Sequence, residues 1–100
     1  MITVESIDLI TIDPEVRGGR PCIADTGLRV IDVVTAALFH GRTPGELASD
    51  YDLSLAEVHA ALAYYYQHKV DLDQDIRDQV DLAQLFKQQG RGSTHPSLLS

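Results

Sequence analysis

The chain has 100 residues, 44% of them hydrophobic, which fits one small globular domain with a single core. Acids outnumber bases 15 to 8, and the formal net charge of −7 argues against broad adhesion to nucleic acid or anionic membranes. Cys22 is the only cysteine, which excludes an internal disulfide. The first ten residues have no basic start and the apolar runs are short, so we expect a cytoplasmic protein with no secretory signal and no membrane contact.

Two short strands are predicted near the N-terminus. Residues 8–12 (DLITI) alternate apolar and polar side chains, and residues 22–25 (CIAD) return after a turn marked by Gly18 and Gly19. The two segments therefore predict a β-hairpin, with an irregular N-terminal arm as the alternative.

The first predicted helix covers residues 30–40 and ends at Gly41. The spacing of its apolar residues puts five of them on one inward face: Val30, Val33, Val34, Ala37 and Leu38.

The next two helix starts are marked by capping boxes, in which Thr43 pairs with Glu46 and Ser54 pairs with Glu57. They predict helices over residues 44–50 and 55–68, joined by a turn of about three residues. This spacing is typical of a helix-turn-helix, whose second helix lies in the major groove of DNA. Two packed helices in a small bundle are the alternative.

The proposed DNA surface is poor in cations. The outward positions near the start of the second helix hold neither arginine nor lysine, although base and phosphate contacts normally use such side chains. The cations lie in the arm and in the loop before the motif, and for each of them a solvated surface charge is the alternative. The predicted DNA-binding residues are Arg17, Arg20, Arg29, Arg42 and His59.

A fourth, amphipathic helix is predicted over residues 71–88, with aspartates opposite a narrow apolar stripe of Leu72, Ile76, Val80, Ala83 and Phe86. The stripe packs either on its own domain or in the groove of a partner. Three consecutive tyrosines precede this helix and cannot all face one core. The predicted partner-binding residues are Tyr64, Tyr66, Leu72, Ile76, Val80 and Phe86.

Nothing in the sequence has the spacing of a catalytic, metal or cofactor site. We therefore expect a protein that is not an enzyme and holds no cofactor, with Cys22 buried and inert. A small enzyme that uses Asp25, His40 or Cys22 is a remote alternative.

The segments ITIDPEVRGGRPCIADTGLRVIDVV and HGRTPGELASDYDLSLAEVHAALAYYYQH resemble the DUF433 family over about residues 8–68. The resemblance implies a homeodomain-like helical domain that dimerises. It also implies an antitoxin role toward a PIN-like nuclease toxin, in the manner of VapB antitoxins with VapC. Many members read GTR-I-P-V where this chain has DTGLRV, so Asp25 replaces a glycine and Gly27 replaces an arginine whose role Arg29 takes over.

The sequence thus predicts a mainly α fold: a homeodomain-like helix-turn-helix bundle with a short N-terminal β-hairpin or arm and a C-terminal helix. The predicted parts are residues 1–70, the acidic helix 71–89 and a flexible tail 90–100. The first functional hypothesis is a homodimeric antitoxin that binds operator DNA and neutralises a PIN-like toxin. The alternative is a dimeric protein-interaction module that uses the helix-turn-helix only as a scaffold.

Overall fold

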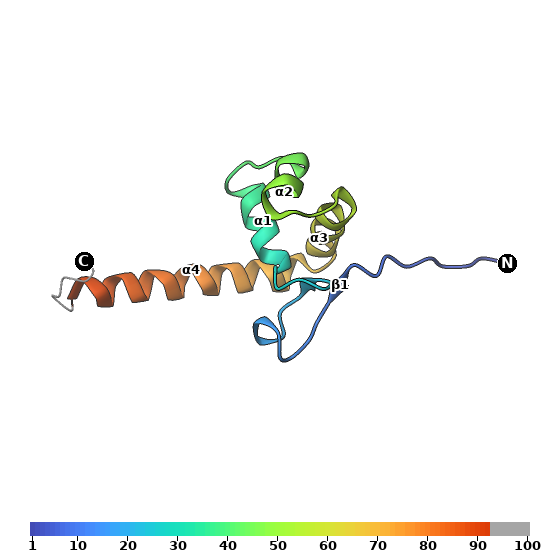
Figure 1. Cartoon of the computed structure of the whole chain (residues 1–100). Helices are drawn as coiled ribbons and strands as arrows, with labels where there is room; N and C mark the ends of the chain where they lie inside the picture. Colours follow the sequence, from blue (N-terminus) through green and yellow to red (C-terminus); the bar gives the residue numbers. More distant parts are fainter. Residues whose placement is uncertain (93–100) are drawn as a thin grey trace. The chain divides into compact units, whose positions relative to one another are not determined.

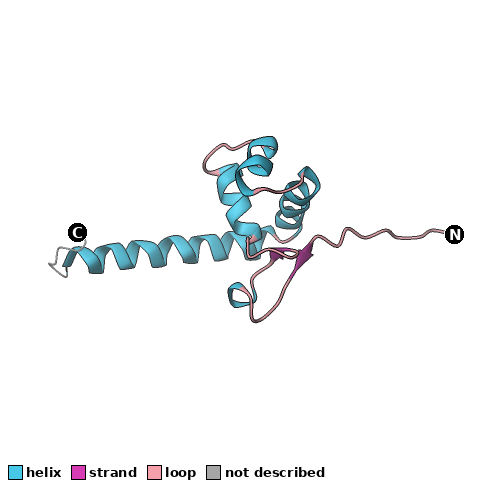
Figure 2. Ribbon diagram, in the orientation of Figure 1, coloured by secondary structure: helices cyan, strands magenta, loops and turns pink. Residues whose placement is uncertain are grey.

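The structure is a computed structural model that describes residues 1–92, with side chains up to Gln89. The chain divides into two compact units, Met1–Lys69 and the segment from Val70 onward. In chain order the elements are β1 (Ile10–Thr11), the 3₁₀ turn η1 (Arg17–Gly19), β2 (Cys22–Ile23), α1 (Val30–Leu38), α2 (Pro44–Tyr51), α3 (Leu55–Gln67) and α4 (Lys69–Gly92). The described residues are therefore mainly helical, with one small antiparallel sheet (Figure 2).

The predicted hairpin is present but shorter than expected. Strands β1 and β2 pair antiparallel with Ile10 opposite Ile23 and Thr11 opposite Cys22. The peptide N–H of Ile23 donates to the Leu28 carbonyl at 3.0 Å, so the chain turns back directly after β2. Asp25 makes this turn with a φ of 62°, a left-handed conformation that aspartate tolerates better than most residues. Because the chain turns directly after Ile23, each strand has only two residues.

Helices α1, α2 and α3 pack on one another around an aliphatic core (Figure 1). The side chains that are fully buried come from every element of this unit except β1 and η1. The largest are Ile23, Val30, Val33, Val34, Leu47 and Val58.

The predicted inward face of α1 needs correction. The helix ends at Leu38 rather than at residue 40, and the Leu38 side chain is 46% exposed. Ile31 and Ala36 are buried instead. Because Ile31 follows Val30 by about 100° around the helix, α1 buries more than one side, which a single-stripe pattern does not predict.

The starts of α2 and α3 are where the capping boxes predicted them. The Glu46 N–H donates to the Thr43 hydroxyl at 3.2 Å, and the Glu57 N–H donates to the Ser54 hydroxyl at 3.0 Å. The two glutamates accept the N–H groups of their N-cap residues in return. Between the helices Asp52 adopts a φ of 56°, so an aspartate supplies the left-handed residue that is usually glycine in such a turn.

Helix α4 is longer than the prediction of 71–88. It includes residues 90–92, which were predicted as tail, and the rest of the predicted tail lies outside the described residues. On its predicted stripe Leu72 and Ile76 are buried, whereas Val80 and Phe86 are exposed.

Candidate functional site

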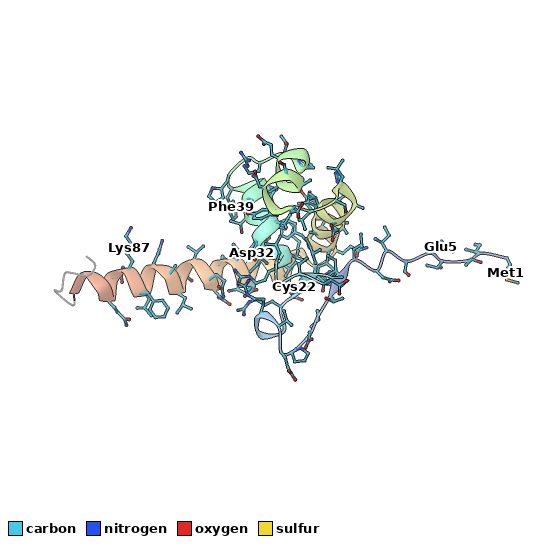
Figure 3. The ribbon with its side chains drawn as sticks, viewed as in Figure 1. Met1, Glu5, Cys22, Asp32, Phe39 and Lys87 are labelled. Carbon is cyan, nitrogen blue, oxygen red and sulfur yellow. The ribbon has the colours of Figure 1, made fainter. Side chains whose placement is uncertain are left out.

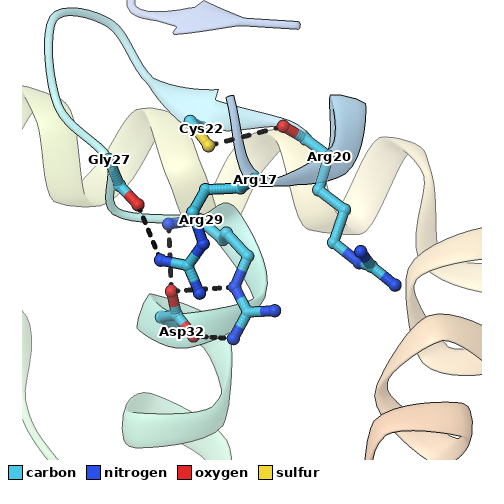
Figure 4. Close-up of polar contacts among 6 residues, drawn as sticks. All are labelled: Arg17, Arg20, Cys22, Gly27, Arg29 and Asp32. Carbon is cyan, nitrogen blue, oxygen red and sulfur yellow. Dashed lines mark hydrogen bonds and ion pairs between the residues drawn. The ribbon is translucent and has the colours of Figure 1, made fainter. Parts of the chain in front are cut away.

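Two of the predicted DNA-binding arginines meet at the start of α1 (Figure 4). Arg29 precedes the helix and forms a two-pronged ion pair with Asp32, at 2.8 Å from Nη2 to Oδ1 and 3.1 Å from Nε to Oδ2. Arg17 reaches the same place from η1, where its Nη1 donates to the Gly27 carbonyl at 3.0 Å. Asp32 also accepts the backbone N–H of Arg29 and so caps the first turn.

The charge of Asp32 is fixed by these contacts. Burial of the carboxyl raises its pKa, but the hydrogen bonds from the Arg29 side chain and backbone outweigh this, and Arg17 adds a favourable charge. The pKa of Asp32 therefore lies below its usual value, and the carboxylate stays ionised at neutral pH. Because Arg29 is paired with this carboxylate, it can contact a phosphate only if it also keeps Asp32 as a partner or if the ion pair breaks.

The segment that holds Arg17 is unusual in its backbone. Arg17, Gly18 and Gly19 have φ values of 51°, 69° and 79°, so three consecutive residues are left-handed. The two glycines adopt this conformation freely, whereas a non-glycine residue such as Arg17 is strained by roughly 1–2 kcal/mol. A Cβ on Gly18 would lie 3.3 Å from Nη1 of Arg20, which runs away from the Arg17–Arg29 pair (Figure 4). From this turn the Arg17 side chain runs to the Gly27 carbonyl and the Arg20 side chain runs away from it (Figure 4).

Arg42 follows the other end of α1, a helix about 13 Å long, and its peptide N–H donates to the Ala36 carbonyl at 3.1 Å. Its Nε donates to Asp50 at 3.0 Å, and its Nη1 lies 3.5 Å from Glu46. The hydrogen bond to Asp50 is the main cause that raises the pKa of Arg42. The arginines predicted as one phosphate-binding set are thus split between the two ends of α1, and acids on α1 and α2 hold two of them.

The outward face of α3 borders the chain's own N-terminal arm. A groove runs between the two, with Ala60, Ala63, Tyr64 and Gln67 on the helix side and Glu5, Ile7 and Ile10 on the arm side. None of these lining residues is a cation, and Glu5 adds an acid. His59 is exposed on the same helix, outside the groove lining.

The three tyrosines of α3 have different surroundings. Tyr65 is buried, whereas Tyr66 is 60% exposed and Tyr64 lines the groove. The Tyr64 ring stacks on His68 with ring centres 4.1 Å apart. The predicted partner residues Tyr64 and Tyr66 are thus accessible, and the buried tyrosine is the middle one.

On α4 the accessible apolar surface is wider than the predicted stripe. Val80 and Phe86 are exposed, as are Leu82 and Leu85, which the prediction omitted. The stripe was drawn at steps of three or four residues from Leu72, and that pattern passes over both leucines. The hydropathy of residues 80–86, considered without regard to helical periodicity, would have identified both leucines.

Comparison with known proteins places this fold in a family. The model of the family described as "Protein of unknown function (DUF433)" matches residues 10–65, more than half of the chain. The chain belongs to the DUF433 family. A crystal structure of a DUF433 member from Anabaena variabilis is similar, with 32% sequence identity and a TM-score of 0.64 over 70% of this chain and 69% of that one. The search of curated proteins found no match.

In this DUF433 protein Cys22 is buried, and its Sγ donates to the Arg20 carbonyl at 3.4 Å. Burial raises the pKa of the thiol, which keeps it in the less reactive protonated form. Among residues 1–92 no three histidine, cysteine or acidic side chains are grouped as metal ligands. No helix in that range combines the length and apolar character that crossing a membrane requires.

Asp32 and Asp50 are the polar residues of these sites that the sequence reasoning missed. The spacing of three between Arg29 and Asp32 was a local signal that could have found one pair. The contacts of Arg42 with Asp50 and of Arg17 with Gly27 depend on how the loops fold, so no short spacing marks them.

Proposed function

We propose that this DUF433 protein is a dimeric protein-interaction module in which α2, the turn and α3 form a helix-turn-helix used as a scaffold. One observation carries the proposal. From Ala60 onward the outward face of α3 borders the N-terminal arm, across a mostly apolar groove whose lining holds Glu5 and no cation. Apolar and tyrosine surface of this kind is typical of protein contacts.

The charges of the first unit support the same function. Residues 1–69 hold ten acids and five bases, so the unit that carries the helix-turn-helix is itself negative. Specific binding to DNA rests largely on cations that contact phosphates. Arg29 and Arg42 already contact Asp32 and Asp50, and a phosphate would have to compete with those carboxylates.

The second candidate is an antitoxin that binds operator DNA and neutralises a PIN-like nuclease toxin. It is favoured by the convergence of Arg17 and Arg29 at the start of α1, where the helix N-terminus also attracts phosphate. In this version the arm arginines contact phosphates beside the helix-turn-helix. The aspartates of α4 then cover a basic surface on the toxin.

A salt titration with DNA from the protein's own promoter separates the two functions. The matched variants are Arg17→Ala and Arg77→Ala, which remove one positive charge each from η1 and from exposed α4. As a protein-interaction module the wild-type chain shows no binding at micromolar protein and low salt, and neither variant changes this.

The antitoxin function predicts a different result for the same titration. Binding would be micromolar or tighter and would weaken with salt. The slope of log K against log salt would fall by about 0.9 in Arg17→Ala, as one lost phosphate contact requires, and would not change in Arg77→Ala. That outcome would overturn the scaffold proposal.

A further inference from the structure

Helix α4 exposes a cluster of large apolar side chains, which we call the α4 patch. Leu82, Leu85 and Phe86 are 46%, 48% and 61% exposed. Val80, 49% exposed, lies about 160° around the helix from Leu82 and is not part of the patch. Leu82, Leu85 and Phe86 fall within about 100° of one another around the helix, so they form one face. An apolar face of this kind marks an interaction surface.

The helix also needs packing in order to form. Its 24 residues extend about 36 Å. Most helical stability in proteins comes from packing of an apolar face rather than from the helix itself. In residues 79–89 that face is exposed within the chain, so a partner that covers it would supply the missing stabilisation.

The charges of α4 favour a second copy of the same helix as that partner. Residues 70–81 hold five aspartates and one arginine, whereas residues 82–92 hold Lys87, Arg91 and no acid. A parallel pair would place the two acidic halves side by side. An antiparallel pair places each acidic half beside the basic half of the other helix, which is the favourable arrangement.

We propose that α4 pairs antiparallel with α4 of a second copy of this chain through the α4 patch. The pairing is centred midway between Leu82 and Phe86, so that Leu82 of one copy lies against Phe86 of the other. This inference rests on the proposed function as a protein-interaction module, because it names the partner and the surface. Figure 3 labels Lys87, whose segment would lie beside the acidic half of the other copy.

Sedimentation equilibrium of the full chain tests the surface with two variants that add the same residue. Leu82→Asp places a charge in the patch. Gln84→Asp adds the same charge to the same helix about 160° away, on the polar side. We expect wild-type and Gln84→Asp chains to be dimers at tens of micromolar, and Leu82→Asp to weaken dimerisation at least tenfold.

Disulfide trapping tests the orientation. Leu85→Cys places a thiol near the centre of the pairing, about 3 Å along the axis from that of the other copy, and should cross-link two copies under mild oxidation. Gln89→Cys lies about one turn further along the same side, where an antiparallel pair holds the two thiols about 15 Å apart along the axis, too far for a disulfide. A parallel pair would cross-link both variants. The wild-type chain is the control, because Cys22 is buried.

The outcomes separate this inference from the proposed function. A monomeric wild-type chain overturns the pairing together with the dimeric state of the proposed module, whereas cross-linking of the Gln89→Cys variant overturns the antiparallel pairing alone. A dimer that Leu82→Asp leaves intact also overturns it, but leaves a dimeric module whose interface lies elsewhere. Promoter binding that depends on Arg17 would instead overturn the proposed function while the α4 pairing persists.

Discussion

Residues 1–69 and helix α4 differ in where their stabilising contacts lie. The first unit buries an aliphatic core inside itself, and both α2 and α3 begin with complete capping boxes. Helix α4 is the longest element, yet its large apolar side chains beyond residue 79 are exposed. The comparison suggests that the first unit is a self-contained scaffold, whereas the second half of α4 is completed by another molecule.

The same substitution in the two regions should have very different effects. Leu47 is fully buried between helices, so Leu47→Ala should lower the free energy of unfolding by about 2–5 kcal/mol through lost burial and a cavity. Leu85→Ala removes a half-exposed side chain from α4 and should cost less than about 1 kcal/mol in dilute, monomeric protein. Urea denaturation of both variants measures this. Equal losses would show that α4 belongs to the same core.

A smaller effect should appear in how the stability of the first unit depends on pH. The pKa of Asp32 is lowered below 3.8 in the folded chain, so its ionised form stabilises the fold above that pH. The contribution is lost as the pH falls through the folded pKa. Thermal unfolding at several pH values should therefore show a smaller loss of stability toward acid pH for Asp32→Asn than for wild type.

Removal of the cation at the same site provides the control for this pH effect. Arg29→Gln takes away the guanidinium charge and the side-chain hydrogen bonds that lower the pKa of Asp32, and leaves the backbone hydrogen bond. Like Asp32→Asn, it should reduce the loss of stability toward acid pH. If wild type and both variants lose stability in parallel below pH 4, the ion pair contributes nothing to the fold.

Features set by neighbouring residues were predictable from the sequence. The capping boxes at Thr43 and Ser54 placed the starts of α2 and α3 correctly, because each box consists of residues three apart. The hairpin pairing was also predicted. The extent of its strands was not, because the left-handed turn at Asp25 depends on the bond between Ile23 and Leu28.

Features set by distant residues were not predictable. The groove between Tyr64 and Glu5 joins segments almost sixty residues apart, and no pattern in either segment indicates it. The inward face of α1 was wrong at Leu38, since a helix packed on more than one side has no single stripe. For the candidate site, the DNA-binding role of the arginines stays a prediction, and their acidic partners and their separation along α1 required the fold.

The most direct test of the two-region account is far-ultraviolet circular dichroism of the full chain at 222 nm over a hundredfold range of protein concentration, beside the molecular mass. If α4 is completed by a second copy, helicity and mass should rise together with one midpoint. The Leu82→Asp chain should keep the lower helicity throughout. A helical signal that stays constant while the mass changes, or that is fully developed in a monomer, would contradict the account.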